Sequence, residues 1–255
     1  MSARLSVFIT GASSGLGAAL ARHYGERSAQ LGLLGRRGDA LEVAAQGLDA
    51  HCYVADVRDL AAMQRAAESF LQAFGPPNIV IAAAGISVGT LTEDAADASV
   101  FRAVMDANVL GLVHTFQAFI EPMRARGSGV LCGISSVAGV RGLPGSGAYS
   151  ASKAAATTYL ESLRLELRAS GISVVTVAPG FIDTPMTQVN PYSMPFRLSA
   201  DQAARQVAAC IARRDAYRVI PWQMAWVARF LKWMPNRLYD AAFEKAPRKP
   251  RHLPL

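Results

Sequence analysis

Hydrophobic and polar residues alternate with two different periods along the chain. Short apolar runs predict six strands, at residues 5–10, 30–34, 51–55, 78–83, 129–134 and 172–178. Helical spacing of apolar residues predicts helices at 18–28, 60–74, 97–121, 148–170 and 199–211. Strands that alternate with helices in this way are typical of a parallel sheet with right-handed crossovers. We therefore expect a doubly wound α/β sheet with helices on both faces.

The start of the predicted helix 148–170 carries a candidate acid–base pair. Tyr149 and Lys153 are four residues apart, so their side chains share one face of the helix. A nearby ammonium group stabilises a phenolate and lowers the pKa of a phenol from its usual value of about 10. Ser136 lies just past a predicted strand, where its hydroxyl could donate a hydrogen bond to a carbonyl oxygen. A chance Tyr-x-x-x-Lys pair is the alternative.

A glycine-rich loop at residues 10–17 connects the first predicted strand to the first predicted helix. Its glycines would let a pyrophosphate approach the backbone, and the helix N-terminus would supply free N–H groups. The spacing G-x-x-x-G-x-G differs from the common dinucleotide fingerprint G-x-G-x-x-G. We interpret the loop as a phosphate cradle, with an ordinary glycine turn as the alternative.

Two arginines follow the second predicted strand, in the run Gly35-Arg36-Arg37. Dinucleotide-binding folds usually place an acidic residue about 20 residues past the glycine loop, where it holds the ribose hydroxyls. No acid ends this strand, and a guanidinium group suits a 2′-phosphate that a carboxylate would repel. The pair therefore predicts that NADP(H) is preferred over NAD(H). A solvated helix start is the alternative interpretation.

Apolar residues are expected around the mouth of the site. Residues 185–198 form a long irregular connection, and such connections often act as lids. The residues expected at the mouth are Leu143, Pro144, Phe181, Met186, Tyr192, Met194 and Phe196. They favour a small apolar substrate. Asn108, which lies among apolar neighbours in the helix 97–121, would either hold a water molecule or tie the helix to a loop.

These features together resemble the short-chain dehydrogenase/reductase family over residues 5–220. The resemblance rests on the motifs Thr10 to Gly17, Asp56-Val57, Ala84-Gly85, Asn108, Ser136, Tyr149 to Lys153 and Pro179 to Thr184. The thirteen-residue step from Ser136 to Tyr149 matches the family pattern and favours Ser136 over Ser135 as the catalytic serine. One departure is the element Ala82-Ala83-Ala84-Gly85, because the family commonly has asparagine at its first position, in N-N-A-G or N-A-A-G. The resemblance implies a single Rossmann-type domain with a seven-stranded, mainly parallel sheet.

The resemblance also implies hydride transfer between a nicotinamide and a carbonyl or alcohol carbon, without a metal. Tyr149 would exchange a proton with the substrate oxygen that Ser136 fixes, and Asn108 would hold the water that reloads it. Lys153 would lower the pKa of the tyrosine and bind the nicotinamide ribose. The cofactor-binding residues implied are Thr10, Gly11, Ser13, Ser14, Gly15, Leu16, Gly17, Arg36, Arg37, Asp56, Val57, Ala84, Gly85, Lys153, Pro179, Gly180, Ile182 and Thr184.

The composition fits one globular domain. Of the 255 residues, 51% are hydrophobic and 18% are charged, which is ample for a buried core. Three widely spaced cysteines form no disulfide or metal pattern and fit a reducing compartment. No apolar run reaches the roughly eighteen residues of a membrane span. We expect a cytoplasmic protein, and the resemblance implies a homodimer or homotetramer.

The net charge of +7 is concentrated at the C-terminal end. From residue 229 onward, seven Lys and Arg residues stand against two Asp and Glu residues. Because the rest of the chain is near balance, we expect no nucleic-acid partner. We treat residues 1–220 as the catalytic domain and 221–255 as a C-terminal extension of it.

The extension begins with a predicted helix at residues 222–234, where Trp222, Trp226, Phe230 and Trp233 share one face. This apolar face would either roof the substrate pocket or pack on a second subunit. The second hypothesis is a peripheral membrane contact, with tryptophans at headgroup depth and the basic run to Arg251 facing anionic lipid.

The leading functional hypothesis is an NADP(H)-dependent oxidoreductase that acts on the carbonyl or alcohol carbon of a small apolar molecule. The alternative is a catalytically weak NADP(H)-binding regulator or sensor. The intact Ser136, Tyr149 and Lys153 favour the enzyme.

Overall fold

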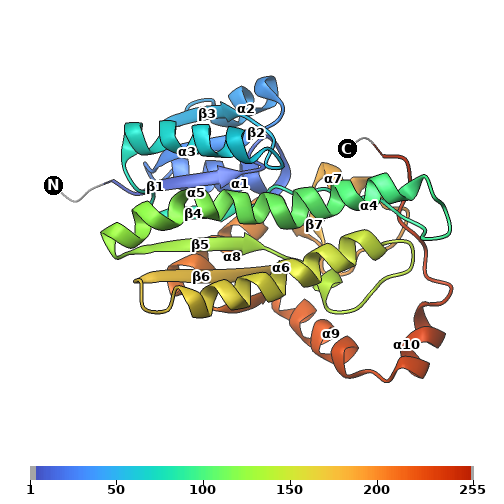
Figure 1. The fold of residues 1–255 in the computed structure, drawn as a ribbon. Coiled ribbons are helices and arrows are strands. Elements are labelled where there is room, and N and C mark those ends of the chain that lie inside the picture. Colours follow the sequence, from blue (N-terminus) through green and yellow to red (C-terminus); the bar gives the residue numbers. More distant parts are fainter. Residues whose placement is uncertain (1–3, 254–255) are drawn as a thin grey trace.

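One parallel sheet organises the molecule (Figure 1). The computed structural model describes residues 4–253. Its main sheet contains seven strands in the order β3-β2-β1-β4-β5-β6-β9. These are β1 (Ser6–Thr10), β2 (Gln30–Gly35), β3 (Ala50–Val54), β4 (Ile79–Ala82), β5 (Gly129–Ile134), β6 (Ile172–Pro179) and β9 (Tyr217–Ile220). Every neighbouring pair is parallel, and the strand order reverses beside β1, which confirms the predicted doubly wound sheet.

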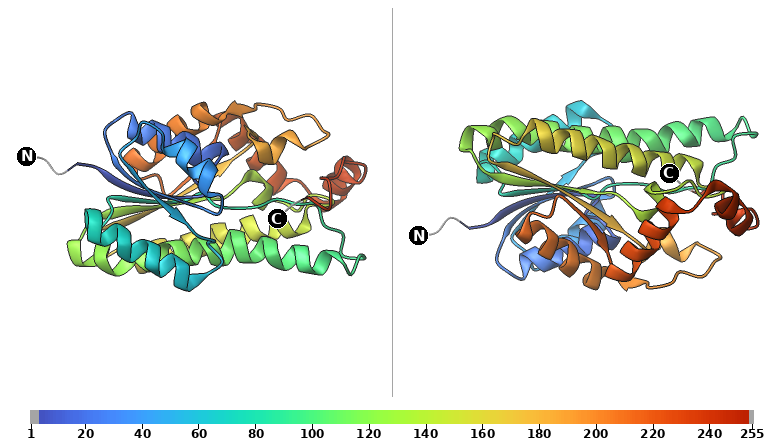
Figure 2. Two further views of the ribbon diagram at one scale, coloured as in Figure 1. Left: turned by 90° about the horizontal axis from the view of Figure 1, so that it is seen from above. Right: turned by 90° about the horizontal axis from the view of Figure 1, so that it is seen from below.

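Helices cover both faces of this sheet, as Figure 2 shows from above and below. One face carries α1 (Gly15–Gly25), α2 (Gly38–Ala45) and α8 (Ala200–Arg213). The other carries α3 (Leu60–Phe74), α4 (Asp97–Met105), the π-helical turn η1 (Asp106–Leu110), α5 (Gly111–Arg126) and α6 (Gly147–Glu166). A capping box is present at the start of α8, where Ser199 and Gln202 bond reciprocally.

The strands are apolar in continuous runs because both of their faces are buried. Val7 and Ile9 of β1 belong to the core beneath α1 and α8. Phe8 points to the opposite face and packs in the core formed with α3, α5 and α6. All three side chains have no exposed surface. A strand covered on both sides loses the alternation of polar and apolar residues that a half-exposed strand shows.

The segment Asp97–Arg126 forms one continuous helical stretch through α4, η1 and α5. By length and composition alone it could cross a membrane. However, Phe116 and Phe119 have no exposed surface and pack with sheet residues in the core. A helix whose side chains pack in this core is an internal helix of the domain.

The C-terminal third of the chain completes the edge of the sheet and leaves it. The strand β9 was not among the six predicted from the sequence. Between β6 and α8 lie β7 (Ile182–Asp183), α7 (Pro185–Gln188) and β8 (Leu198–Ser199). The helix α7 and the start of β8 fall within the predicted irregular connection 185–198, and β7 precedes it. After β9, the helices α9 (Trp222–Trp233) and α10 (Asn236–Phe243) project from one corner of the molecule (Figure 1).

Candidate active site

The carboxyl ends of the parallel strands form one edge of the sheet, and a cleft opens along it. Ligands of doubly wound folds bind at this edge, where the strand order reverses. Most of the predicted site residues line the cleft: Gly11, Ser13, Ser14, Gly15, Leu16, Gly17, Arg36, Arg37, Asp56, Val57, Ala84, Gly85, Ser136, Tyr149, Lys153, Pro179, Gly180, Ile182 and Thr184. Thr10 and Asn108 are buried and lie outside the lining.

Ser136, Tyr149 and Lys153 meet in the cleft, although they come from two different elements. Ser136 begins the short helix η2 (Val137–Gly139), and its hydroxyl accepts a hydrogen bond from the Ala138 N–H at 3.1 Å. Lys153 lies one turn along α6 from Tyr149, with its Nζ 5.8 Å from the centre of the phenol ring. That ammonium donates to the carbonyl of Ile134, at the end of β5, at 2.9 Å. The strand end therefore positions the lysine.

The hydroxyl of Ser135 is engaged by α6. It donates to the Lys153 carbonyl on α6 at 3.0 Å, and it lies 2.6 Å from the Thr157 hydroxyl. Both contacts tie β5 to α6. The hydroxyl of Ser136, by contrast, donates to the carbonyl of Pro179 at the end of β6, at 3.4 Å, and Ser136 lines the cleft together with Tyr149. This geometry supports Ser136 as the serine of the site.

Burial dominates the protonation of the two titratable groups in the site. Burial raises the pKa of the Tyr149 phenol, and the hydrogen bond with Ser136 partly offsets that rise. Burial also lowers the pKa of Lys153 to about 8. The sequence predicted that Lys153 would lower the pKa of Tyr149. The net shift in the structure is upward, because burial outweighs the hydrogen bond and the ammonium is directed at the Ile134 carbonyl.

The glycine loop fits a pyrophosphate group. Gly11 has a φ of +72°, and a Cβ there would lie 2.7 Å from the Cα of Ala84. A Cβ on Gly17 would collide with the carbonyl oxygen of Gly11. Ser14 is the N-cap of α1, and among the described residues its side chain makes no capping hydrogen bond. The N–H groups of the first turn therefore remain available to an anion.

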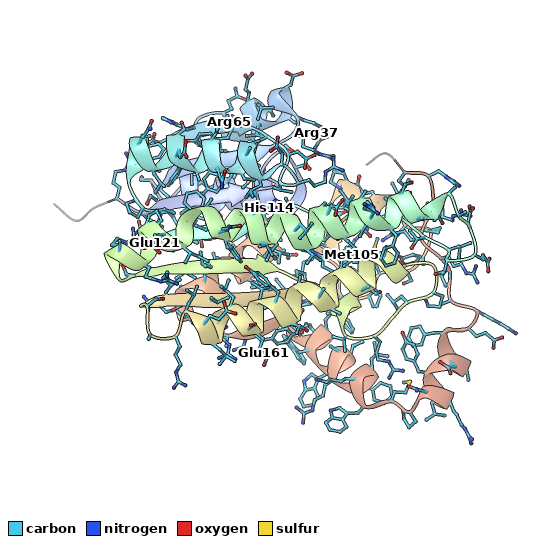
Figure 3. The ribbon with its side chains drawn as sticks, viewed as in Figure 1. Arg37, Arg65, Met105, His114, Glu121 and Glu161 are labelled. Carbon is cyan, nitrogen blue, oxygen red and sulfur yellow. The ribbon has the colours of Figure 1, made fainter. Side chains whose placement is uncertain are left out.

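Cations surround the cleft where β2 and β3 end. Arg36 and Arg37 follow β2, and the Nη2 of Arg37 lies 3.5 Å from the hydroxyl of Ser13 (Figure 3). Asp56 is held by Arg58, whose Nη2 and Nε donate to the carboxylate at 2.6 and 3.0 Å. Burial opposes ionisation of Asp56, but the contacts with Arg58 and the charge of Arg36 outweigh it and hold the pKa of Asp56 below its usual value.

Residues 6–193 match the family model for short chain dehydrogenases. The chain belongs to the short-chain dehydrogenase/reductase family. An uncharacterized oxidoreductase of Myxococcus xanthus is 37% identical over 242 residues, which cover 93% of this chain and 95% of that protein. Sulfoacetaldehyde reductase 2 of Chromohalobacter salexigens is 34% identical over 203 residues, which cover 78% of each chain.

A solved structure extends the likeness to the whole fold. The short-chain dehydrogenase/reductase of Burkholderia phymatum in complex with NAD is 25% identical, covers 98% of both chains and has a TM-score of 0.80. The protein is therefore an oxidoreductase of a family that acts on CH–OH and C=O groups of small molecules with a nicotinamide cofactor.

In this short-chain dehydrogenase, Asn108 ties a helix to a loop. It lies in η1, where the π-helical turn directs its amide toward the loop after β4. Its Oδ1 accepts from the N–H of Ile86 at 2.8 Å, and its Nδ2 donates to the carbonyl of Ile86 at 3.0 Å. A further hydrogen bond reaches the hydroxyl of Ser152 at 2.9 Å. Of the two predicted alternatives, these contacts favour the tie, and the water relay stays a prediction.

Several lining residues were missed in the sequence: Leu34, Gly35, Ala55, Arg58, Ala83, Ile86, Ala107, Ile134, Ser135, Pro185 and Thr187. Most are immediate neighbours of predicted residues, and Arg58 could have been found as a third arginine beside the Asp56-Val57 motif. Of the apolar residues expected at the mouth, Met186 lines the cleft. The other six lie outside the lining: Leu143, Pro144, Phe181, Tyr192, Met194 and Phe196.

Proposed function

We propose that this enzyme transfers a hydride between NADP(H) and the carbonyl or alcohol carbon of a small apolar molecule. The observation that carries the proposal is that Ser136, Tyr149 and Lys153 line the same cleft as the glycine loop. A proton donor, a hydroxyl clamp and a dinucleotide cradle at one strand edge are the parts that such a reaction requires.

The side chains have separate tasks in this proposal. A bound nicotinamide would supply or accept the hydride. Tyr149 gives its proton to the substrate oxygen during reduction and takes a proton from the hydroxyl during oxidation. Ser136 donates a hydrogen bond to the same oxygen and holds it beside the phenol. Lys153 places positive charge near the phenol, where negative charge develops as the proton leaves.

Three guanidinium groups support the preference for NADP(H). Arg36 and Arg37 follow β2, where an adenine ribose would lie in a fold of this kind, and Arg58 completes the cationic corner. Planar guanidinium groups bind phosphate through paired hydrogen bonds. Asp56 is engaged by Arg58, so its carboxylate repels a 2′-phosphate less than a free acid would.

Apolar walls support the substrate class. Ile86, Ile134 and Met186 are among the residues that line the cleft. Apolar linings with a few polar groups are typical of small-molecule sites. The family acts on small-molecule substrates, and it implies no nucleic-acid partner. The homo-oligomeric state and cytoplasmic location stay predictions.

A carbonyl panel assayed with NADPH and NADH side by side tests the proposal. We expect reduction of apolar aldehydes or ketones, with a kcat/KM for NADPH at least about tenfold above that for NADH. Replacing Arg36 and Arg37 with alanine should weaken NADPH binding about a hundredfold, because each charged hydrogen bond contributes about 1.5–3 kcal/mol. NADH binding should change little.

Arg65→Ala is the matched control, since Arg65 is exposed on α3 (Figure 3) and lies outside the cleft lining. Equal losses for NADPH and NADH in the Arg36 and Arg37 variant would disprove the 2′-phosphate assignment. Failure to reduce any carbonyl with either cofactor would disprove the reaction itself.

A further inference from the structure

The two C-terminal helices expose an unusual apolar surface. We call it the aromatic face, and it consists of Trp222, Trp226, Phe230 and Trp233 of α9 with Leu238 of α10. The exposed fraction of these side chains runs from 62% for Leu238 to 77% for Trp233. Large contiguous apolar surfaces of this kind usually mark a contact with another molecule.

The aromatic face is a regular stripe along α9. Its four aromatic residues recur at steps of four, four and three positions, which places them within an arc of about 80° on a helix. The opposite side of α9 is used for packing, because Met224 and Ala228 are buried in the small core beside β9. The helix could therefore turn its aromatic side inward only by losing that core. The expectation that this face roofs the substrate pocket is not met by the structure.

The loop between η2 and α6, which contains Arg141 and Gly142, holds α9 and α10 in place. Arg141 donates to the carbonyls of Leu231 and Met234, at 3.1 and 2.9 Å, and to the Oδ1 of Asn236. Its guanidinium also lies 4.1 Å from the centre of the Tyr239 ring. The Tyr239 hydroxyl donates to the carbonyl of Gly142 at 2.7 Å. The aromatic face is therefore a rigidly mounted surface.

Positive charge predominates beside this stripe. The helix α9 contains Arg229 and Lys232 and no Asp or Glu, and α10 adds Arg237 and one acid, Asp240. Arg229, Lys232 and Arg237 are exposed, and none of them forms an ion pair within residues 4–253. The surface thus combines tryptophan and phenylalanine with unpaired cations.

We propose that the aromatic face docks on the surface of an anionic lipid bilayer. Tryptophan side chains favour headgroup depth, where an apolar ring meets a polar boundary, and neighbouring Lys and Arg residues are attracted to anionic lipid. A second copy of this chain is a poorer occupant, because self-docking of the same face would bring like charges together. The occupant is the bilayer interface.

The basic run that the sequence suggested for lipid is shorter in the structure. Arg251 pairs with Asp94 and Asp97, and Lys249 is buried with its ammonium on the carbonyl of Met186. These two cations are therefore engaged within the protein. The charge that faces lipid comes from Arg229, Lys232 and Arg237.

Intrinsic tryptophan fluorescence reports on this surface alone, since all three tryptophans of the chain lie in α9. We expect the emission of the full-length protein to shift to shorter wavelength when phosphatidylglycerol vesicles are added. The protein should also float with these vesicles and should bind phosphatidylcholine vesicles at least about tenfold more weakly. Both measurements are independent of catalysis.

Two variants separate the apolar and the charged contributions. Replacing Trp226, Phe230 and Trp233 with serine should reduce partition into anionic vesicles at least about tenfold, since most of the inserted apolar area is removed. Replacing Arg229, Lys232 and Arg237 with glutamine should remove the preference for anionic lipid. The control replaces Val43 and Leu165 with serine, because these apolar side chains are 73% and 58% exposed on other helices.

Three outcomes would overturn the proposal. The wild-type protein could remain unbound to anionic vesicles, or the control could lose as much binding as the aromatic variant. The third outcome is self-association. Sedimentation would then show that the wild-type protein is a dimer and the serine variant a monomer, and neither protein would bind the vesicles. A circular dichroism spectrum equal to that of the wild type checks that the exposed substitutions leave the fold intact.

Discussion

The phenol of Tyr149 is the residue on which the proposed chemistry depends. Burial raises its pKa, so the phenol keeps its proton at neutral pH and is ready to act as an acid. Lys153, with a pKa of about 8, is mainly protonated under the same conditions. This combination favours carbonyl reduction near pH 7, because alcohol oxidation would require the phenolate.

Replacing Tyr149 with phenylalanine should remove the acid and preserve the shape of the cleft. We expect kcat for carbonyl reduction to fall by about 10² to 10⁴-fold, the usual contribution of a positioned acid. NADPH affinity, measured by fluorescence titration, should stay within about twofold. Tyr159→Phe, a change on the same helix but outside the cleft lining, should retain full activity. Wild-type turnover by Tyr149→Phe would refute the assignment.

Lys153 should set the alkaline limb of the reduction rate. As pH rises through about 8, its ammonium loses a proton and no longer stabilises negative charge beside the phenol. We expect kcat/KM for reduction to be constant near neutral pH and to decrease above about pH 8, as measured by a steady-state pH profile. Lys249→Met is the matched control, because burial also lowers the pKa of Lys249 to about 8 outside the site. If the alkaline decrease disappears in Lys249→Met, it arises from Lys249 and its assignment to Lys153 is wrong.

The sequence could identify site residues whose placement depends on local geometry. Tyr149 and Lys153 share a face because four residues make about one helical turn, and Ser136 follows a recognisable strand. The hydrogen bond from Lys153 to Ile134 and the ion pair of Arg58 depend on how separate segments approach one another. Those contacts, and the direction of the Tyr149 shift, needed the structure.

Element prediction succeeded where a segment was long and periodic, and failed at the sheet edge. The predicted strand 129–134 has the same bounds as β5, whose six residues are all buried. The missed β9 has only four residues, and the first two are exposed. A short edge strand of mixed polarity has no clear period, so its pairing with β6 determines its conformation.

A substitution that removes a single oxygen atom tests the contact between α10 and the loop after Ser136. Tyr239→Phe removes the hydroxyl that donates to Gly142 and keeps the ring that stacks on Phe243. We expect a loss of about 1 kcal/mol of folding free energy, as for one buried hydrogen bond, and faster amide exchange in residues 137–147. Chemical denaturation and hydrogen exchange measure the two effects. Tyr159→Phe controls for loss of a hydroxyl, and equal exchange in both variants would contradict the role of this contact.

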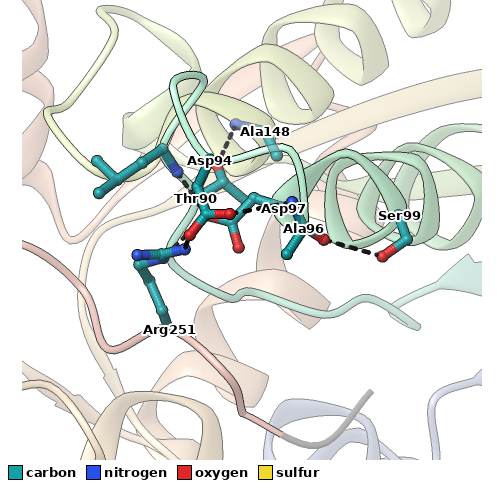
Figure 4. Close-up of polar contacts among 8 residues, drawn as sticks. Thr90, Asp94, Ala96, Asp97, Ser99, Ala148 and Arg251 are labelled. Carbon is teal, nitrogen blue, oxygen red and sulfur yellow. Dashed lines mark hydrogen bonds and ion pairs between the residues drawn. The ribbon is translucent and has the colours of Figure 1, made fainter.

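At the scale of the whole molecule, the C-terminal tail joins segments that are far apart in the sequence. Arg251 pairs with Asp94, in the loop that precedes α4, and with Asp97, the first residue of α4 (Figure 4). The neighbouring Pro250 carbonyl accepts from the N–H of Gly89 at 2.9 Å. Lys249 reaches the carbonyl of Met186 on α7 at 3.3 Å. The tail therefore links the loop after β4 to α7, whose Met186 lines the cleft. Charge counting along the sequence could not separate these engaged cations from exposed ones.

Lys249 makes this link at a cost that depends on pH. It is 7% exposed, and burial lowers the pKa of its ammonium from the usual 10.5 to about 8. The buried lysine binds a proton less tightly than the same lysine does in the unfolded chain. At pH values where the unfolded lysine is protonated, this difference lowers the free energy of unfolding. The cost is fully present below about pH 8 and disappears as pH rises toward 10.5.

Replacing Lys249 with methionine should therefore stabilise the protein. The methionine fills similar space without a buried charge, and it loses one hydrogen bond to Met186. We expect a gain of about 1–3 kcal/mol in the free energy of unfolding at neutral pH, measured by denaturant titration, and a much smaller gain near pH 10. Lys245→Met, in the exposed part of the same tail, should show no such pH dependence. A variant that is less stable than the wild type at both pH values would mean that the ammonium is a net stabilising contact of the tail.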